Sequence, residues 1–355
     1  MKFWCFIKGL LPFYYQISNN KDCNWNCQVS PKQLVVFGRP HLYYEHNHSV
    51  HILSDICPHQ GAYLSKGWIN KRGNIHCPYH GFEYDPEGRF MCIPTPELAK
   101  KGGRHCPLKK YEIYQNGKDL YLCPTDQKPE PQHLPYYPPE HYDDKFTAIS
   151  GTQMISQDYR VTTENVLDML HISYVHTFGN INEPLPFNIQ YHQLSDISGR
   201  TTFQYKPFNY TISMMMGNDT KVIVENEFIL PTTTITRVIS GDIVKTVMTR
   251  STPVSKNKTL FFYTVYRNFW FCRWKWMTWV NRIFDVFMKV MMDLTISEDV
   301  AILKNVNPKH RVGTVVTKYD VTIQQYRQAS QRFMDKLKKT KNPTEAITSN
   351  QTHCQ

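Results

Sequence analysis

Two short loops of the chain each offer one thiol and one imidazole. The first, CPHQG, contains Cys57 and His59, and the second, HCPYHG, contains Cys77 and His80. Four such ligands suit either a structural zinc ion or an iron–sulfur cluster. Zinc modules usually pair cysteine with cysteine and histidine with histidine, whereas each loop here mixes the two types. The spacing favours a two-iron cluster, and a zinc-stabilised binding module is the alternative.

Mixed loops can serve a two-iron cluster because each loop can give its thiolate to one iron and its imidazole to the other. Replacing two thiolates by neutral imidazoles removes negative charge from the cluster and raises its reduction potential. Pro58 and Pro78 stiffen the loops, and Gly61 and Gly81 permit tight turns. The loops therefore predict a one-electron relay of moderate potential.

A second group of chemically active residues lies in ENVLDMLHISYVHTFGN, residues 164–180, which overlaps a helix predicted around residues 160–175. Asp168 and His171 stand three positions apart, which places them on one helical face. His171 and His176 stand five apart, about 140° around an ideal helix. Both histidines can reach one ion only if the helix ends or distorts near residues 173–174.

A third metal ligand is sought among the carboxylates, because two histidines and one carboxylate on one face of Fe(II) leave positions open for dioxygen and substrate. The segment SEDVAILKNV supplies Glu298 and Asp299 on a predicted helix. Asp299 is the predicted ligand, and Glu298 is the alternative because a slip of one residue would exchange them.

The order of elements predicts an α+β protein with two domains. Residues 1–125 read as short strands cut by turns, and residues 126–146 form a proline-rich linker that disfavours helix and central strand. Residues 147–340 combine helical segments with a long β-rich stretch, and residues 341–355 form a tail that is expected to be disordered.

The segment at residues 268–294 is the most apolar and aromatic part of the chain. Charged residues interrupt it too often for a membrane span: Arg273, Lys275, Arg282, Asp285 and Lys289. A core helix is expected here. The alternative is a helix on a membrane surface, because interleaved tryptophan and basic residues are typical of one.

Composition limits the remaining classes. The 355 residues are 41% hydrophobic, have a formal net charge of +11 and include ten cysteines in no closely spaced framework. The thinly spread lysines indicate a basic surface that could face an acidic protein, and no nucleic-acid partner is expected. The cysteine pattern indicates a reducing compartment. Because Lys8 and Pro12 interrupt the apolar start, no signal peptide is expected, and the predicted location is cytoplasmic.

The motif C-x-H, a spacer of 17 residues and C-x-x-H resembles the signature of the Rieske proteins. This motif is followed by a linker, the pattern N-x-x-D-x-x-H-x4-H, a β-rich stretch and a late E-D pair. In this order the chain resembles the Rieske non-heme iron oxygenases over roughly residues 10–335. Within that family it most resembles the vanillate O-demethylase and pheophorbide oxygenase groups. The resemblance implies an N-terminal all-β Rieske domain and a helix-grip-like catalytic domain, in which an antiparallel sheet packs against helices.

The resemblance also implies cofactors and residue roles. A [2Fe-2S] cluster would have Cys57 and Cys77 on one iron and His59 and His80 on the other, and a mononuclear Fe(II) would have three protein ligands: His171, His176 and Asp299. Asp168 would bridge the two metal centres between subunits of a homotrimer, contact His80 of the neighbouring subunit and orient His171. Asn165 would be a polar group near the iron.

The implied activity is hydroxylation or oxidative demethylation of a bulky, largely apolar organic substrate with dioxygen. The chain has no G-x-G-x-x-G dinucleotide motif, so a separate ferredoxin or NAD(P)H-dependent reductase would supply the electrons. The alternative is a Rieske electron-transfer protein that lacks a functional mononuclear iron.

Overall fold

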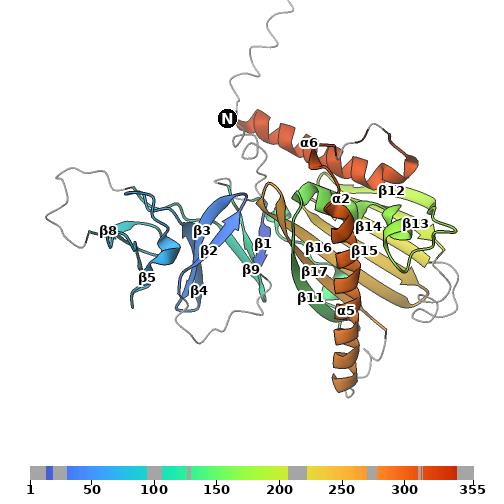
Figure 1. The fold of residues 1–355 in the computed structure, drawn as a ribbon, viewed down its shortest axis with the longest axis horizontal. Helices are drawn as coiled ribbons and strands as arrows, with labels where there is room; N and C mark the ends of the chain where they lie inside the picture. The colour runs from blue at the N-terminus through green and yellow to red at the C-terminus, as the bar shows by residue number, and fades with distance from the viewer. Residues whose placement is uncertain are drawn as a thin grey trace, which may run out of the picture. The chain divides into compact units, whose positions relative to one another are not determined.

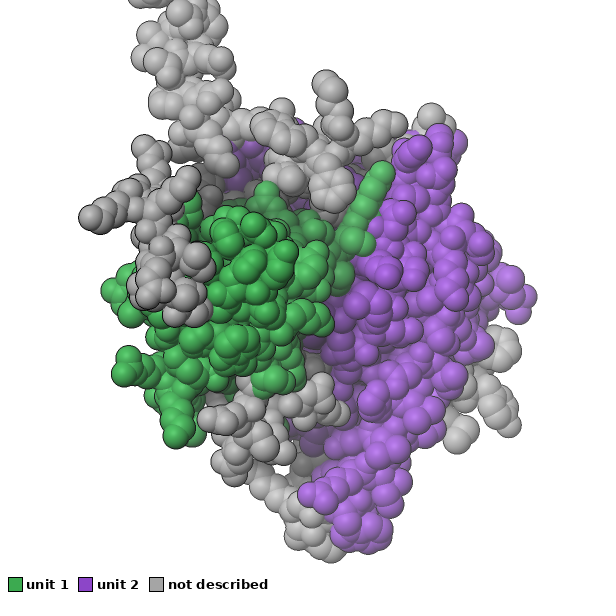
Figure 2. Space-filling model, turned by 60° about the vertical axis from the view of Figure 1, so that its left-hand side comes forward, with its two compact units in different colours: residues 1–135, 253–256 green, residues 136–252, 257–355 purple. Residues whose placement is uncertain are grey.

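The computed structural model describes residues 13–18, 30–93, 106–125, 129–206, 222–269, 278–310, 313 and 315–341. The chain divides into two compact units (Figure 2). Unit 1 consists of residues 1–135 and 253–256, and unit 2 of residues 136–252 and 257–355. The division at residues 135–136 falls inside the proline-rich stretch. The predicted disordered tail, apart from Lys341, lies outside the described residues.

Unit 1 is built from short antiparallel strands in three small sheets, ordered β1-β10-β9, β2-β3-β4 and β5-β6-β7-β8 (Figure 1). Their bounds are β1 Tyr15–Ser18, β2 Lys32–Val36, β3 Arg39–His46, β4 Ser49–Ser54, β5 Trp68–Ile69, β6 Ile75–His76, β7 Glu83–Tyr84, β8 Phe90–Cys92, β9 Ile113–Asn116 and β10 Asp119–Leu122. The described part of the unit also contains two short 3-10 helices, η1 Leu64–Lys66 and η3 Pro131–His133. Asn47 and His48, both with positive φ, form the two-residue turn between β3 and β4, a geometry that suits the twist of a hairpin.

The main core of unit 1 contains the two cysteines of the sequence motif. Cys57 and Cys77 are each 1% exposed and pack among Leu64, Ile75 and Tyr84. The thiols therefore lie in a dry, apolar environment, which removes competing water from any metal they hold.

Unit 2 is a seven-stranded antiparallel sheet with helices, in the order β11-β17-β16-β15-β14-β13-β12 (Figure 1). The strands are β11 Thr147–Ile155, β12 Phe187–Ser195, β13 Ser198–Tyr205, β14 Val222–Ile229, β15 Thr233–Ser240, β16 Ile243–Ser255 and β17 Lys258–Arg267. Among its described residues are the α-helices α2 Tyr159–Leu167, α3 His171–Val175, α5 Thr278–Leu303 and α6 Val321–Lys341. Three 3-10 helices also occur: η4 Pro139–His141, η5 Pro308–His310 and η6 Lys318–Asp320.

The helices pack on one face of this sheet, which we call the helix face. Met288, Met292 and Ile296 of α5 share a buried cluster with residues of β17. Thr322 of α6 bonds to Thr201 of β13 at 2.7 Å. The alternation of side chains along each strand then decides which strand residues meet the helices.

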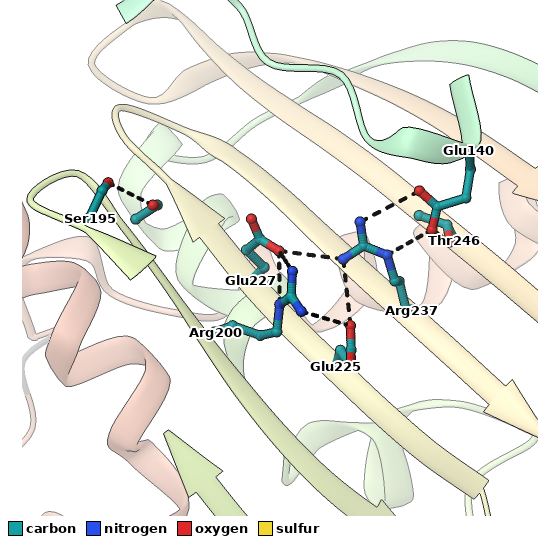
Figure 3. Close-up of polar contacts among 8 residues, drawn as sticks. Glu140, Ser195, Arg200, Glu225, Glu227, Arg237 and Thr246 are labelled. Atoms are coloured by element: carbon teal, nitrogen blue, oxygen red, sulfur yellow. Dashed lines mark hydrogen bonds and ion pairs between the residues drawn. The ribbon is translucent and has the colours of Figure 1, made fainter. Parts of the chain in front are cut away.

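The opposite face carries a network of charges (Figure 3). Arg237 bonds to Glu140 at 2.7 Å, and Arg200 bonds to Glu227 at 2.8 Å. Glu227 points away from the helices because its neighbour Asn226 bonds to the Val166 carbonyl of α2. Since Glu140 belongs to η4, the network holds the second half of the proline-rich linker onto the sheet.

Helix α5 has two apolar sides. The core-helix prediction is confirmed for the side that carries Met288, Met292 and Ile296. On the other side, six apolar residues are at least 45% exposed and form what we call the outer stripe: Trp279, Ile283, Val286, Phe287, Val290 and Leu294. No helix in the described part of the chain is long and apolar enough to cross a membrane, and residues 270–277 of the apolar segment lie outside that part.

Candidate metal centres

The two cysteine–histidine loops have the same backbone hydrogen bonds. In each loop the cysteine N–H donates to the carbonyl five residues later, and the glycine N–H donates back to the cysteine carbonyl, all at 2.9 Å. Gly61 and Gly81 have φ values of 77° and 71°, which residues with a Cβ rarely adopt. The loops are thus a structurally matched pair, and Cys57 and Cys77 occupy equivalent positions in them.

The four ligand-type side chains divide by type. Cys57 and Cys77 are buried, whereas His59 and His80 are exposed and bring their Nδ1 atoms to 3.1 Å from each other. Burial raises the pKa of the Cys77 thiol, and the Cys57 thiol beside it adds to the effect. Two thiols inside and two imidazoles outside provide separate sites for two metal ions.

Aromatic side chains surround these ligands. The Tyr84 hydroxyl lies 3.6 Å from the Cys57 sulfur, so it can donate a hydrogen bond to a thiolate there. The Phe82 ring stacks on His59 with ring centroids 4.5 Å apart, and Tyr79 stacks on His80 at 3.8 Å. Sequence reasoning predicted these four residues as ligands but missed Tyr84, because nothing in the motif spacing indicates which strand residue reaches a thiol.

The second group forms where the chain changes from one helix to another. Asp158 caps α2 by accepting the Arg160 N–H, and α2 ends at Leu167. The Asp168 carboxylate then accepts the Leu170 N–H at 2.8 Å, and α3 begins at His171. The Asp168 carboxylate thus takes the place of a backbone carbonyl as acceptor for the Leu170 N–H, which interrupts the helical hydrogen bonds between α2 and α3.

The prediction of one helix over residues 160–175 is therefore wrong in one respect. The break falls at residues 168–170 rather than 173–174, so Asp168 and His171 do not share a helical face. The second break, at the end of α3, places His176 in extended backbone. These two breaks bring both imidazoles to one point.

Three ligand-type side chains of unit 2 converge. The Nε2 atoms of His171 and His176 are 3.3 Å apart, and each lies 3.6 Å from Oδ1 of Asp299 on α5. These atoms can bind one ion, because bonds of about 2 Å at angles near 100° place neighbouring ligand atoms about 3.1 Å apart, close to the distances found here. The three side chains are buried or nearly so.

The hydrogen bonds of the histidines fix which nitrogen is available. His171 Nδ1 contacts the Asp168 carbonyl at 2.8 Å, and His176 Nδ1 contacts the Glu298 carboxylate at 2.9 Å. Both partners are acceptors, so each Nδ1 must carry the proton. Each Nε2 therefore presents a lone pair to the point they share.

Burial lowers the pKa of His176, which favours the neutral form that can bind a metal. Asp299 Oδ1 is buried and has no hydrogen-bond partner among the described residues. A buried carboxylate oxygen without a partner is costly unless a cation faces it. The donor set of two unprotonated nitrogens and this oxygen therefore fits a divalent iron.

The structure separates the roles of the two adjacent carboxylates. Asp299 faces both Nε2 atoms, while Glu298 bonds to the far nitrogen of His176 and to the Thr177 N–H at 3.3 Å. Sequence reasoning left these residues as alternatives for one role. Their geometry suits them to different roles: Asp299 could bind a metal, and Glu298 could orient the His176 ring.

The other two predicted residues, Asp168 and Asn165, have only local contacts among the described residues, and their predicted roles stay predictions. Asp168 contacts His171 through its backbone carbonyl, while its carboxylate is used by the Leu170 N–H. Asn165 lies in the last turn of α2, half-buried, and its carbonyl accepts the Asp168 N–H at 3.2 Å. No hydrogen bond among the described residues joins its side chain to the three ligands.

The two motifs define the class of protein, a Rieske protein with a second iron site. Residues 14–112 match the Rieske [2Fe-2S] domain family. Residues 155–336, just over half of the chain, match the vanillate O-demethylase oxygenase C-terminal domain family. The chain belongs to this second family of Rieske non-heme iron oxygenases.

Individual relatives agree with the family. The chain is 28% identical over 167 residues to protein TIC 55 of Arabidopsis thaliana, a match that covers 46% of this chain and 29% of that protein. It is 29% identical over 124 residues to the vanillate O-demethylase oxygenase subunit of Pseudomonas sp. (strain HR199 / DSM 7063), covering 35% of this chain and 34% of that one. The chain thus spans about a third of the length of these relatives.

The fold has neighbours among solved structures. NdmA of Pseudomonas putida CBB5, as a QL mutant with caffeine, superposes with a TM-score of 0.72 at 16% identity and covers 96% of this chain and 94% of that one. The fold prediction of an N-terminal Rieske domain and an α+β domain is confirmed.

The family implies two cofactors, a [2Fe-2S] cluster and a mononuclear iron. The matched loops with buried thiols and paired Nδ1 atoms fit the cluster. The convergent nitrogens and the unpartnered Asp299 oxygen fit the iron. Both cofactor predictions therefore agree with the residues present.

Proposed function

We propose that the protein is an oxygenase component that uses dioxygen and externally supplied electrons to hydroxylate or oxidatively demethylate a bulky, largely apolar organic substrate. The observation that carries this proposal is the convergence of His171, His176 and Asp299. An electron-transfer protein without a second iron would not need a buried carboxylate oxygen aimed at two unprotonated imidazole nitrogens.

When bound, the cluster supplies single electrons and the iron supplies a site at which dioxygen can be activated. The protein's own residues prepare these sites. The Asp168 carbonyl and the Glu298 carboxylate hold the histidine rings in position. Cys57 and Cys77 lie in the core, where water is excluded. This preorganisation keeps each ligand in its metal-binding form.

The partners belong to the same proposal. A ferredoxin or an NAD(P)H-dependent reductase would reduce the cluster, and the net charge of +11 favours an acidic donor. A head-to-tail homotrimer would bring the cluster of one subunit near the iron of the next, with Asp168 between them. A reducing, cytoplasmic location is part of this proposal, because the ten cysteines of the sequence form no closely spaced framework.

Metal content tests the proposal against its two alternatives. Anaerobically purified protein should contain about three irons and two sulfides per chain. An electron carrier would contain about two irons, and a zinc module would be colourless and free of sulfide.

Turnover supplies the second test. With a surrogate reductase, the protein should consume dioxygen in proportion to product formed from an aromatic methyl ether such as vanillate. Asp299→Ala should lose the mononuclear iron and turnover while keeping the cluster spectrum. A variant at this position that retains full iron content and turnover would show that the carboxylate is not a ligand.

A further inference from the structure

A lysine lies on the helix face of the unit 2 sheet, where strand residues are expected to be apolar. Lys245 is in β16, two positions before Val247, which packs in the same cluster as Met288 and Met292 of α5. Side chains two apart on a strand point to the same face. Lys245 therefore points toward the helices and not toward the charged network on the opposite face.

On one side, the neighbours of Lys245 lead to the iron site. Lys245 pairs with Val238 of β15, and Val238 pairs with Val224 of β14. Both valines pack in a cluster with Ile172, the residue that follows His171 on α3. Lys245 thus lies one strand away from the apolar surface beneath the iron-binding helix.

On the other side lies a second cation, Arg267 of β17. The Asn268 N–H donates to the Val244 carbonyl, which places Arg267 beside Lys245 in the antiparallel ladder. Arg267 is 2% exposed and bonds to Asp285 of α5 at 2.7 Å. The single carboxylate of Asp285 is therefore used by Arg267.

This arrangement leaves Lys245 without an anionic partner among the described residues. No hydrogen bond or ion pair joins Lys245 to any other described residue, although its side chain is largely enclosed. Burial lowers the pKa of Lys245, because an ammonium that has left water without gaining an anion is destabilised. Lys245 is therefore complementary to an additional anion, since no carboxylate of the described residues pairs with it.

We propose that Lys245 binds an anionic group, a carboxylate or a sulfonate, on an otherwise apolar substrate. The partly buried Val238 next to it would contact the apolar body, which would then extend toward the iron site. This inference rests on the proposed function, because only an oxygenase would use the bound molecule as its substrate. Binding of the molecule can be measured without catalysis. A charge-assisted hydrogen bond in a partly enclosed site strengthens such binding about tenfold or more.

A matched pair of probes tests whether Lys245 binds the anionic group of a ligand. The dye 8-anilinonaphthalene-1-sulfonate is bulky, apolar and anionic, and N-phenyl-1-naphthylamine is the same molecule without the sulfonate. Equilibrium dialysis against the metal-loaded full chain would give the affinity for each. The variants are Lys245→Met, which keeps length but removes charge, and Lys245→Arg, which keeps the charge. Lys258→Met, at an exposed position in the next strand, is the control.

We expect Lys245→Met to weaken sulfonate binding about tenfold or more, with little effect on the neutral probe. Lys245→Arg should recover most of the loss, and the control should resemble the wild type. Any of three results would overturn the proposal. Wild type and Lys245→Met could bind the sulfonate equally well, Lys245→Met could lose affinity for both probes in parallel, or the wild type could show no preference for the anionic probe. Failure of the proposed function would show separately, as missing iron or absent turnover.

Discussion

Glu298 offers the sharpest test of how the iron site is built. Its carboxylate accepts a hydrogen bond from His176 Nδ1 at 2.9 Å and one from the Thr177 N–H at 3.3 Å. Glu298→Ala removes both and should leave α5 intact, since alanine is the best helix former. Without the acceptor, the imidazole can rotate or move its proton to Nε2, and either change opposes metal binding.

The expected magnitude follows from burial. The His176 side chain is 5% exposed and that of Glu298 is 22% exposed, so solvent weakens their bond only in part. A hydrogen bond to a charged group in such a setting stabilises by about 1.5 to 2 kcal/mol. This corresponds to about a ten- to thirtyfold loss of iron affinity.

The assay is removal of the mononuclear iron by a chelator under anaerobic conditions, with the visible spectrum of the cluster as an internal reference. Glu298→Gln should lose less, because an amide oxygen can still accept from Nδ1. Glu183→Ala, which removes an exposed carboxylate paired with Lys206, is the control. If Glu298→Ala binds iron as the wild type does, the orienting role is wrong. If Glu298→Gln loses iron while Asp299→Asn keeps it, the ligand has been assigned to the wrong carboxylate.

Four further predictions concern other parts of the molecule. Tyr84→Phe removes the hydroxyl 3.6 Å from the Cys57 sulfur and should lower the cluster's reduction potential in a redox titration, because a hydrogen bond to the cluster favours its more negative, reduced state; an unchanged potential would contradict this. Asp168→Asn should keep both metals, since the backbone carbonyl still holds His171, but lose coupled turnover, and turnover at the wild-type rate would exclude the bridging role. Burial lowers the pKa of His41 from 6.5 to about 4, so between pH 6.5 and pH 4 the unfolded chain binds a proton at His41 that the folded chain does not. The free energy of unfolding should therefore fall by roughly 3 kcal/mol as the pH drops through that range. In urea unfolding at several pH values, His41→Phe should show a weaker dependence of this free energy on pH than the wild type. Turnover with an acidic ferredoxin should fall steeply with ionic strength, and a flat dependence would remove the electrostatic docking.

The cluster ligands could be predicted from sequence because each loop is local. Five or six residues supply a thiol, an imidazole, a proline and a glycine, and short-range hydrogen bonds close the loop around them. The iron ligands were harder to predict because the third comes from a distant helix. Glu298 and Asp299 differ by 100° around α5, and the packing of Met292 and Ile296 decides which of them faces the histidines.

The helix break and Lys245 show two limits of reading a sequence alone. The run VLDMLHISYV has apolar residues at helical spacing, so Asp168 reads as a helical position until its carboxylate is seen to accept the Leu170 N–H. A lysine in IVKTVMTR reads as a solvent-facing strand residue. Its direction depends on which face the helices cover, and that is determined by contacts between distant segments.

The outer stripe of α5 has a practical consequence for anyone who handles this protein. Its six apolar side chains point away from the sheet on the same helix that brings Asp299 to the histidines. A surface of this kind adsorbs to hydrophobic resins and to detergent micelles. Retention on a phenyl column should therefore be long, and mild detergent in the storage buffer should slow precipitation at high concentration.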